Sequence, residues 1–349
     1  MDTMTTIDRT SATAALVAAC TAAALAPSVH NTQPWRWRIE GGRADLYADA
    51  RRQLRVTDPD HRLLTVSCGA VLHEACVALA AAGITMEVSR LADPEDDDHS
   101  RMQPARIGLG YLARITVTGR APISDTAARL HRMTTLRHAD RRPLLDEPLP
   151  ATAMTAMRAV AGTFGIALHP LSRDQVITLA SATSRSQDAE VREPAARAEL
   201  DAWTDPQRPA DAGVPDTSIP DRIVPTTVPM RDFGHLGSLA IPDGHGGRDG
   251  HDNSATYVIL YGLAEQARSW LRAGEALDAI WLTATEHDIA LLPLSAAVES
   301  TATRQELHRI LAGLGYPYLA LRLGIADASL PAADRTPRLP ADVNVEVLP

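Results

Sequence analysis

A faint internal repeat constrains the fold of this 349-residue chain more than any other feature. The segments 69–84 and 274–289 both have the pattern of a helix, and glycine, leucine and isoleucine fall at the same offsets in each. Each segment is followed by a strand that contains Tyr-Leu-Ala, at Tyr111 and at Tyr318. Matched landmarks in the same order predict a duplicated architecture with two related halves.

Apolar periodicity and turn residues predict strands interleaved with helices, which is typical of an α+β or α/β protein. The first half is expected to span 10–125 and the second 126–345. The expected helices are 11–26, 67–82, 150–162, 172–184, 189–203, 264–287 and 303–313, and the expected strands are 35–39, 43–48, 84–90, 106–118, 255–261 and 316–323.

The segment 205–252 is rich in proline, glycine and aspartate and has little periodicity. A structureless stretch this long is either a functional lid or a disordered excursion. Apolar residues punctuate its prolines, which favours a lid that packs on a surface. His245 and His251 lie among glycines in 243–252, and we expect the tip of the lid there rather than a metal site.

Composition excludes several classes of function. The formal charge of −9 argues against nucleic acid or an anionic membrane as a general partner, and no apolar run suggests a membrane span. The chain has no lysine, which excludes Schiff-base chemistry and leaves any phosphate to arginine or backbone amides.

Cys20, Cys68 and Cys76 lack metal or redox spacing and indicate buried thiols in a reducing cytoplasm. The alternative is export, since 17–20 resembles a lipoprotein cleavage box, but the preceding segment lacks the positive charge of an export signal.

Polar side chains are concentrated where the first apolar helix ends. An Ala/Leu-rich run stops at Pro27, and Ser28, Asn31 and Gln33 then present hydroxyl and amide groups before Pro34. Such groups at a helix-to-strand corner can recognise the edge of a planar heteroaromatic ring. An Asx-rich turn without a ligand is the alternative.

Arginines mark two further segments. Arg137 and Arg141 precede the first helix of the second half, and Arg338 follows the last core strand. The guanidinium groups of Arg137 and Arg141 suit bidentate capture of a phosphate, although a solvated turn is the alternative. For Arg338 the residues by themselves favour a polar C-terminal extension.

Residues 27–35 resemble the P-S-x-x-N-x-Q-P-W segment of the FMN-dependent nitroreductase superfamily. Arg137 and Arg141 match its R-x-[ST]-x-R phosphate segment, with Ala139 where the pattern has Ser or Thr. Arg338 matches the family's C-terminal arginine, with Thr336 where lysine is common. Ser295 lies in the segment 292–295, which follows an apolar strand and resembles the family's loop that points N–H groups at the flavin. Further matches to the Acg-type branch, single chains that imitate the nitroreductase dimer, run through 10–345 at 55–60, 67–70, 211–215 and 270–277.

This resemblance implies a tandem nitroreductase-like α+β fold, a pseudo-dimeric monomer with a lid, and higher oligomers left open. The flavin-ring segment occurs only in the first half and the Arg-x-x-x-Arg segment only in the second, so one FMN site is expected and its mirror image is lost. The implied ligands of FMN are Ser28, Asn31, Gln33, Arg137, Arg141, Ser295 and Arg338.

The implied activity is transfer of hydride from NAD(P)H through FMN to a nitro, quinone or other electron-poor small molecule. The cofactor carries this chemistry, so no catalytic side chain is predicted. The alternative is a protein that sequesters FMN without turnover. The residues do not decide between NADH and NADPH.

Overall fold

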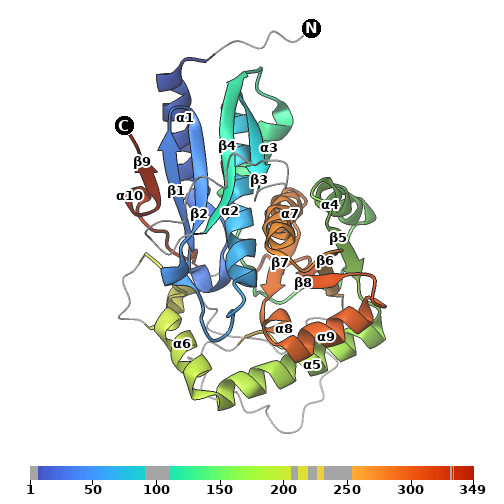
Figure 1. Ribbon diagram of the computed structural model, residues 1–349. Helices are drawn as coiled ribbons and strands as arrows, with labels where there is room; N and C mark the ends of the chain where they lie inside the picture. The colour runs from blue at the N-terminus through green and yellow to red at the C-terminus, as the bar shows by residue number, and fades with distance from the viewer. Residues whose placement is uncertain are drawn as a thin grey trace.

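The computed structural model describes residues 7–90, 110–205, 211–218, 226–231, 254–330, 332 and 334–349. In the first half the helices and strands are α1 (Arg9–Ala22), β1 (Trp35–Glu40), β2 (Arg43–Ala48), α2 (Arg62–Ala81), β3 (Ile84–Arg90) and β4 (Tyr111–Arg120), and α3 (Asp125–Thr134) opens the second half (Figure 1). Asp8 begins α1 because its carboxylate accepts the N–H of Ser11 at 2.9 Å. Gly41 and Gly42 close the β1–β2 hairpin with φ of 54° and 83°, a turn that β-branched residues could not adopt without strain.

The second half begins with a helix and ends on the first half's sheet. Its other elements are α4 (Ala151–Thr163), β5 (Ala167–Pro170), α5 (Arg173–Arg192), α6 (Pro194–Thr204), β6 (Thr256–Gly262), α7 (Ala267–Glu286), β7 (Ala290–Leu294), α8 (Ala296–Glu299), α9 (Thr301–Ile310), β8 (Tyr316–Gly324), α10 (Ala341–Asn344) and β9 (Val345–Val347). Short 3₁₀ turns lie at Ala23–Leu25, Val29–Asn31, Ala50–Arg52 and Asp216–Ser218.

The strands form two separate sheets with closely related topology. One is five-stranded, in the order β3-β4-β2-β1-β9, and the other is four-stranded, in the order β5-β6-β8-β7. Apart from β9, every neighbouring pair in both sheets is antiparallel. The same spatial order of four strands therefore occurs in both sheets, with β1, β2, β3 and β4 at the places of β5, β6, β7 and β8. In the second half, α5 and α6 lie between β5 and β6 in the sequence, and α8 and α9 lie between β7 and β8.

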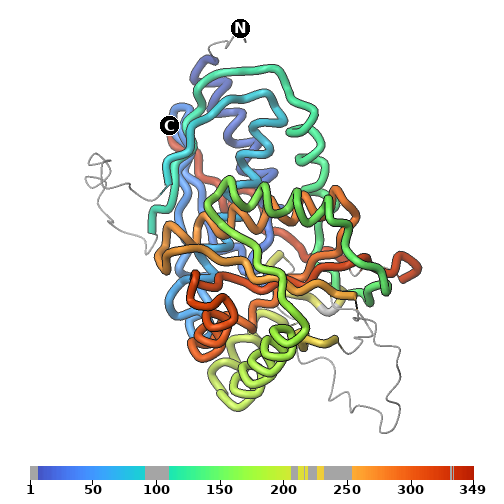
Figure 2. Tube along the Cα trace, turned by 90° about the vertical axis from the view of Figure 1, so that its right-hand side faces the viewer, coloured from blue at the N-terminus to red at the C-terminus, as the bar shows by residue number. Residues whose placement is uncertain are grey.

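The C-terminal strand returns to the first sheet. β9 pairs with β1 in parallel, with Trp37 opposite Val345. Both ends of the described chain consequently lie at the end of the molecule that carries the first sheet, whereas α5 and α6 lie at the opposite end (Figure 1, Figure 2).

The long helices α2 and α7 pack against each other at two glycines. A Cβ added to Gly69 would lie 1.9 Å from the carbonyl oxygen of Leu271, and one added to Gly274 would lie 1.9 Å from that of Val66. Each glycine thus lies against the residue three positions before the other glycine. The absence of a side chain at both positions allows the two backbones to touch.

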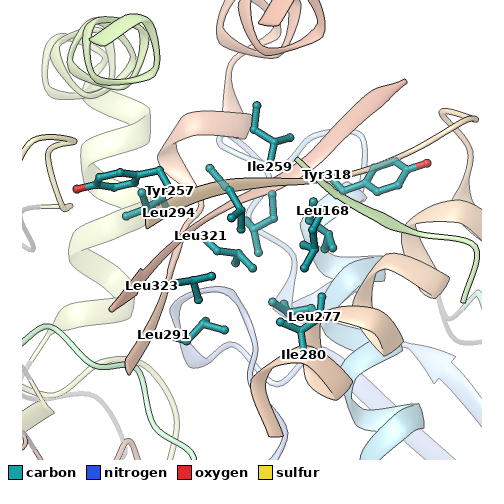
Figure 3. Close-up of a cluster of buried hydrophobic side chains, with 14 of the residues drawn as sticks. Leu168, Tyr257, Ile259, Leu277, Ile280, Leu291, Leu294, Tyr318, Leu321 and Leu323 are labelled. Carbon is teal, nitrogen blue, oxygen red and sulfur yellow. The ribbon is translucent and has the colours of Figure 1, made fainter. Parts of the chain in front are cut away.

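This helix pair contributes to both hydrophobic cores. The core of the second half combines Leu277 and Ile280 of α7 with strand residues such as Leu291 and Leu321 (Figure 3), and it also contains Val66 of α2. The core of the first half contains Leu271 of α7 beside the buried face of α2. Because each helix is buried on both sides, the two halves form one packed unit.

Most predicted elements are present, with shifted ends. The hairpin 35–48 and strand 84–90 are confirmed, and the helix expected from 67 begins five residues earlier at Arg62. It begins there because the Asp58 carboxylate accepts the N–H groups of Leu63 and Leu64 at 3.1 and 2.8 Å. The expected ranges cover none of six elements: α3, β5, β7, α8, α10 and β9. Within the described ranges α2 is the one helix long and apolar enough to cross a membrane, and most of it is buried inside the protein.

Candidate functional site

A cavity lies where the two halves meet, and residues from distant parts of the chain line it. The first half contributes the loop 25–31 and one face of α2. The second half contributes 134–141, α5, the segments 214–218 and 229–231, α7, the turn from β7 into α8, and the tail 334–338. Six of the seven predicted ligands line it, namely Ser28, Asn31, Arg137, Arg141, Ser295 and Arg338.

The loop that carries Ser28 and Asn31 has an unusual backbone. His30, Asn31 and Gln33 have φ of 46°, 52° and 49°, in the left-handed region that most side chains avoid. The Ser28 hydroxyl stabilises this conformation by accepting the N–H of Gln33 at 2.9 Å. Backbone strain of this kind is retained when the surrounding structure fixes it, and it is concentrated at ligand sites.

Asn31 joins three segments at the wall of the cavity. Its Nδ2 donates to the carbonyl oxygens of Gly213 and Pro337, both at 2.9 Å, and its Oδ1 accepts from Arg338 at 3.1 Å. Its side chain is therefore committed to protein contacts, and a ligand beside it would meet a fixed wall.

Gln33 lies behind the cavity rather than in its lining. Its Nε2 donates to the carbonyl oxygen of Asp211 at 3.0 Å, and its Oε1 accepts the N–H of Leu339 at 2.9 Å. It is fully buried. The structure thus places Gln33 one layer away from the predicted ligand position, where it ties the loop to the tail.

Arg137 and Arg338 meet at one carbonyl group. Both donate to the carbonyl oxygen of Leu25, Arg338 at 3.0 Å. The Arg137 guanidinium also lies 4.8 Å from the ring centroid of Trp281, which stabilises the cation through the aromatic face. The Nε atoms of Arg137 and Arg338 have no hydrogen-bond partner in the described structure.

The arginines are crowded in a way that favours an anion. Burial lowers the pKa of Arg338 to about 9, assisted by repulsion from Arg137 and Arg335 and opposed by Glu74. Burial likewise lowers the pKa of Arg141 to about 10, against the attraction of Asp140. A depressed arginine pKa means that positive charge is insufficiently compensated, so an anion bound here would stabilise the cluster.

The structure describes two short segments of the predicted lid, 211–218 and 226–231. Val214 and Ser218 line the cavity from the first, and Pro229, Met230 and Arg231 line it from the second. The Arg231 guanidinium pairs with Glu190 of α5 and Glu299 of α8. Residues 206–210, 219–225 and 232–253, including His245 and His251, lie outside the described residues. Among those described, no cluster of histidine, cysteine and carboxylate side chains suits a metal ion.

Sequence reasoning missed several residues of this site. His30 lines the cavity in neutral form, because burial and the charges of Arg231 and Arg141 hold its pKa well below its usual value. Trp281 and Arg231 also line it, and Glu74 lies behind Arg137. A glutamate inside the apolar 62–81 helix is the one local signal that could have indicated a buried charge.

Comparisons with known proteins agree with the sequence resemblance. "Putative NAD(P)H nitroreductase Rv3131" of Mycobacterium tuberculosis is 34% identical over 322 residues, which cover 91% of this chain and 87% of that protein. "Putative NAD(P)H nitroreductase acg" of the same organism is 30% identical over 346 residues, 98% of this chain and 96% of that protein. No family model matched the chain.

Two solved structures match part of the chain with low TM-scores. A nitroreductase with bound FMN from Bacteroides fragilis covers 59% of this chain and 93% of its own, with a TM-score of 0.37 and 12% identity. The FMN-dependent nitroreductase NfnB from Mycobacterium smegmatis, in complex with NADPH, covers 63% of this chain and 97% of its own, with a TM-score of 0.33 and 19% identity. Scores this low give no residue-by-residue correspondence.

Proposed function

Since this chain belongs to the NAD(P)H nitroreductase family, we propose that it binds one FMN and passes hydride from NAD(P)H to an electron-poor small molecule. Nitro compounds and quinones are the proposed acceptors. The observation that carries the proposal is the cavity in which Arg137, Arg141 and Arg338 of the second half converge with the Ser28–Asn31 loop of the first.

The residues present fit FMN in charge and in the polarity of the lining. The Nε atoms of Arg137 and Arg338 have no hydrogen-bond partner in the described structure, and the pKa values of Arg338 and Arg141 are lowered. Both features suit a phosphate dianion. Ser28 and Ser295, together with apolar residues such as Leu63, Val66 and Leu277, supply the mixed lining that a planar heteroaromatic ring needs. Gln33 would act indirectly by fixing the loop.

When bound, FMN supplies the redox chemistry by accepting hydride from the nicotinamide and giving electrons to the acceptor. The chain's own residues bind, orient and exclude water. Arg137, Arg141 and Arg338 would hold the phosphate, and the Ser28–Asn31 loop and Ser295 would border the ring. The apolar lining from α2 and α7 would keep water from the reacting face.

We further propose that the two halves are diverged copies packed as a pseudo-dimer. The shared strand order supports this, as does the reciprocal contact at Gly69 and Gly274, because a residue on a twofold axis meets its own equivalent. The connection from α1 to β1 spans 23–34, whereas its counterpart from α4 to β5 is 164–166. This difference supports a single site, since the shorter connection has no room for a flavin-ring loop.

Retention of FMN without turnover is the second candidate function. The observation that favours it is Arg231, whose pairing with Glu190 and Glu299 fastens the segment 226–231 against the cavity. We propose that this segment belongs to a lid formed by residues 205–252.

We also propose a cytoplasmic location, because Cys20, Cys68 and Cys76 are free thiols.

Anaerobic mixing with NADPH or NADH distinguishes the two functions. We expect a yellow protein that releases one equivalent of flavin on heating, and whose flavin absorption is bleached within seconds of mixing. Absence of bleaching over minutes would assign the protein to FMN retention. A colourless protein that takes up no added FMN would contradict both functions.

A further inference from the structure

A buried acidic pair lies directly behind the arginines of the cavity. Glu74 of α2 is 1% exposed and Asp278 of α7 is 0% exposed, and their side chains face each other across the contact between the two helices. Neither residue lines the cavity, and neither has a part in the function proposed above. Buried carboxyl groups are costly unless they are paired, so this pair needs an explanation.

The pair belongs to a row of charged groups that leads to the cavity. His73 and Asp278 are joined by a 2.7 Å contact between Nδ1 and Oδ2. At the other end, Glu74 Oε1 lies 3.8 Å from Arg137 Nε. Neither of these last two atoms has a hydrogen-bond partner in the described structure, and Asp278 Oδ1 has none either. The contact between Glu74 and Arg137 is therefore loose, with both atoms available to another partner.

The groups around Glu74 oppose one another. Burial and the neighbouring Asp278 raise the pKa of Glu74 well above its usual value, whereas Arg137 and Arg338 lower it. These groups come from four parts of the chain: His73 from α2, Asp278 from α7, Arg137 from the segment before α4, and Arg338 from the tail. A phosphate dianion would neutralise the two arginines and so remove the influence that favours the Glu74 carboxylate.

We propose that Glu74 is the proton acceptor that balances the charge of the phosphate site: it takes up one proton from solvent when a phosphate dianion binds at Arg137 and Arg338. Glu74 then stands behind the phosphate as a neutral acid and does not repel it. This inference rests on the proposed function, since the phosphate is that of FMN. It makes Glu74 a positioning residue, which acts on the ligand through Arg137.

Proton linkage determines how FMN affinity should change with pH. If binding raises the pKa of Glu74, protons are taken up with FMN, and FMN affinity falls as pH rises, by up to about tenfold per pH unit for one full proton. Riboflavin, which lacks the phosphate, would bind without this proton. Glu74→Gln keeps the size of the side chain and is permanently neutral, so its FMN affinity would not follow this pH dependence.

The test is titration calorimetry of the full-length protein, freed of flavin, between pH 7 and 8.5 in buffers of different ionisation enthalpy. We expect proton uptake approaching one per FMN for the wild type, and little for riboflavin or for Glu74→Gln. Glu87→Gln, the same change on the exposed part of β3, should behave like the wild type. Circular dichroism establishes that each variant is folded, and the comparison of FMN with riboflavin in the wild type needs no variant.

Equal proton uptake with FMN and riboflavin, or unchanged uptake in Glu74→Gln, would overturn the inference while leaving FMN binding intact. Failure of the wild type to bind FMN would instead refute the proposed function on which the inference rests. The two failures are therefore distinguishable in one set of titrations.

Discussion

Substitution of Gly274 by alanine tests the central helix contact directly. In an open helix this change stabilises by about 1 kcal/mol, because alanine has the higher helix propensity. Here the new methyl carbon would lie 1.9 Å from the Val66 carbonyl oxygen and 2.8 Å from the Gly69 Cα. Both are backbone atoms, so no side-chain rotation relieves the overlap and the helices must separate by more than about 1 Å. Overpacking costs about 1–3 kcal/mol, and a backbone clash falls at the upper end, so we expect a net loss of about 2 kcal/mol in the free energy of unfolding.

Urea denaturation measures this loss as a lower midpoint at unchanged slope. Gly162→Ala is the matched control, since Gly162 lies in the helix α4 with no atom within 4 Å of the added Cβ, and it should be neutral or stabilising. Gly69→Ala should resemble Gly274→Ala. The double variant should cost less than the sum of the two, because one separation of the helices relieves both overlaps. Equal midpoints for Gly274→Ala and Gly162→Ala would refute the contact between α2 and α7.

Two further predictions concern the cavity. Arg137→Ala should weaken FMN binding about tenfold or more, because it removes a charge-assisted contact, and Arg129→Ala at an exposed position of α3 should not; equal dissociation constants in fluorescence titrations would exclude Arg137 as a phosphate ligand. Arg231→Gln leaves Glu190 and Glu299 without their cation and should release the segment 226–231, so reduction of a bulky quinone should accelerate more than reduction of a small one; an unchanged ratio of the two rates would contradict the lid.

Local sequence patterns indicated six of the residues that line the cavity, but not His30, Trp281 or Arg231, and not the residues that support the lining. Asn31, Arg137 and Arg338 each belong to a short motif whose residue types suit a ligand, and all three line the same cavity. The repeated glycines 69 and 274 were found as matching offsets in two helices. Their mutual contact is a tertiary fact that neither segment contains alone.

The supporting residues could not be predicted because their partners are distant in the chain. Glu74 and Asp278 face each other from helices about 200 residues apart in sequence, and each looks like an isolated charge in its own helix. Gln33 was predicted as a ligand because its amide can bind a flavin, yet that amide forms hydrogen bonds with two backbone groups from other segments. The strand Val345–Val347 is too short to show a period, and it is ordered only because β1 offers an edge.

The chain returns to its first sheet at β9, so its two ends lie close together in space. The arrangement of the two halves therefore does not depend on which half comes first in the sequence. β9 lies beside β1 and α1, so the last strand and the first helix are neighbours. A short linker could join the two ends, and the chain could then be opened in the exposed connection 145–150 between α3 and α4. Such a circular permutant would begin at α4 and end after α3, so Arg338 would precede the Ser28–Asn31 loop in the new sequence and Arg137 and Arg141 would follow it. It should keep every contact described for the cavity, because no residue that lines the cavity lies in the connection that is cut.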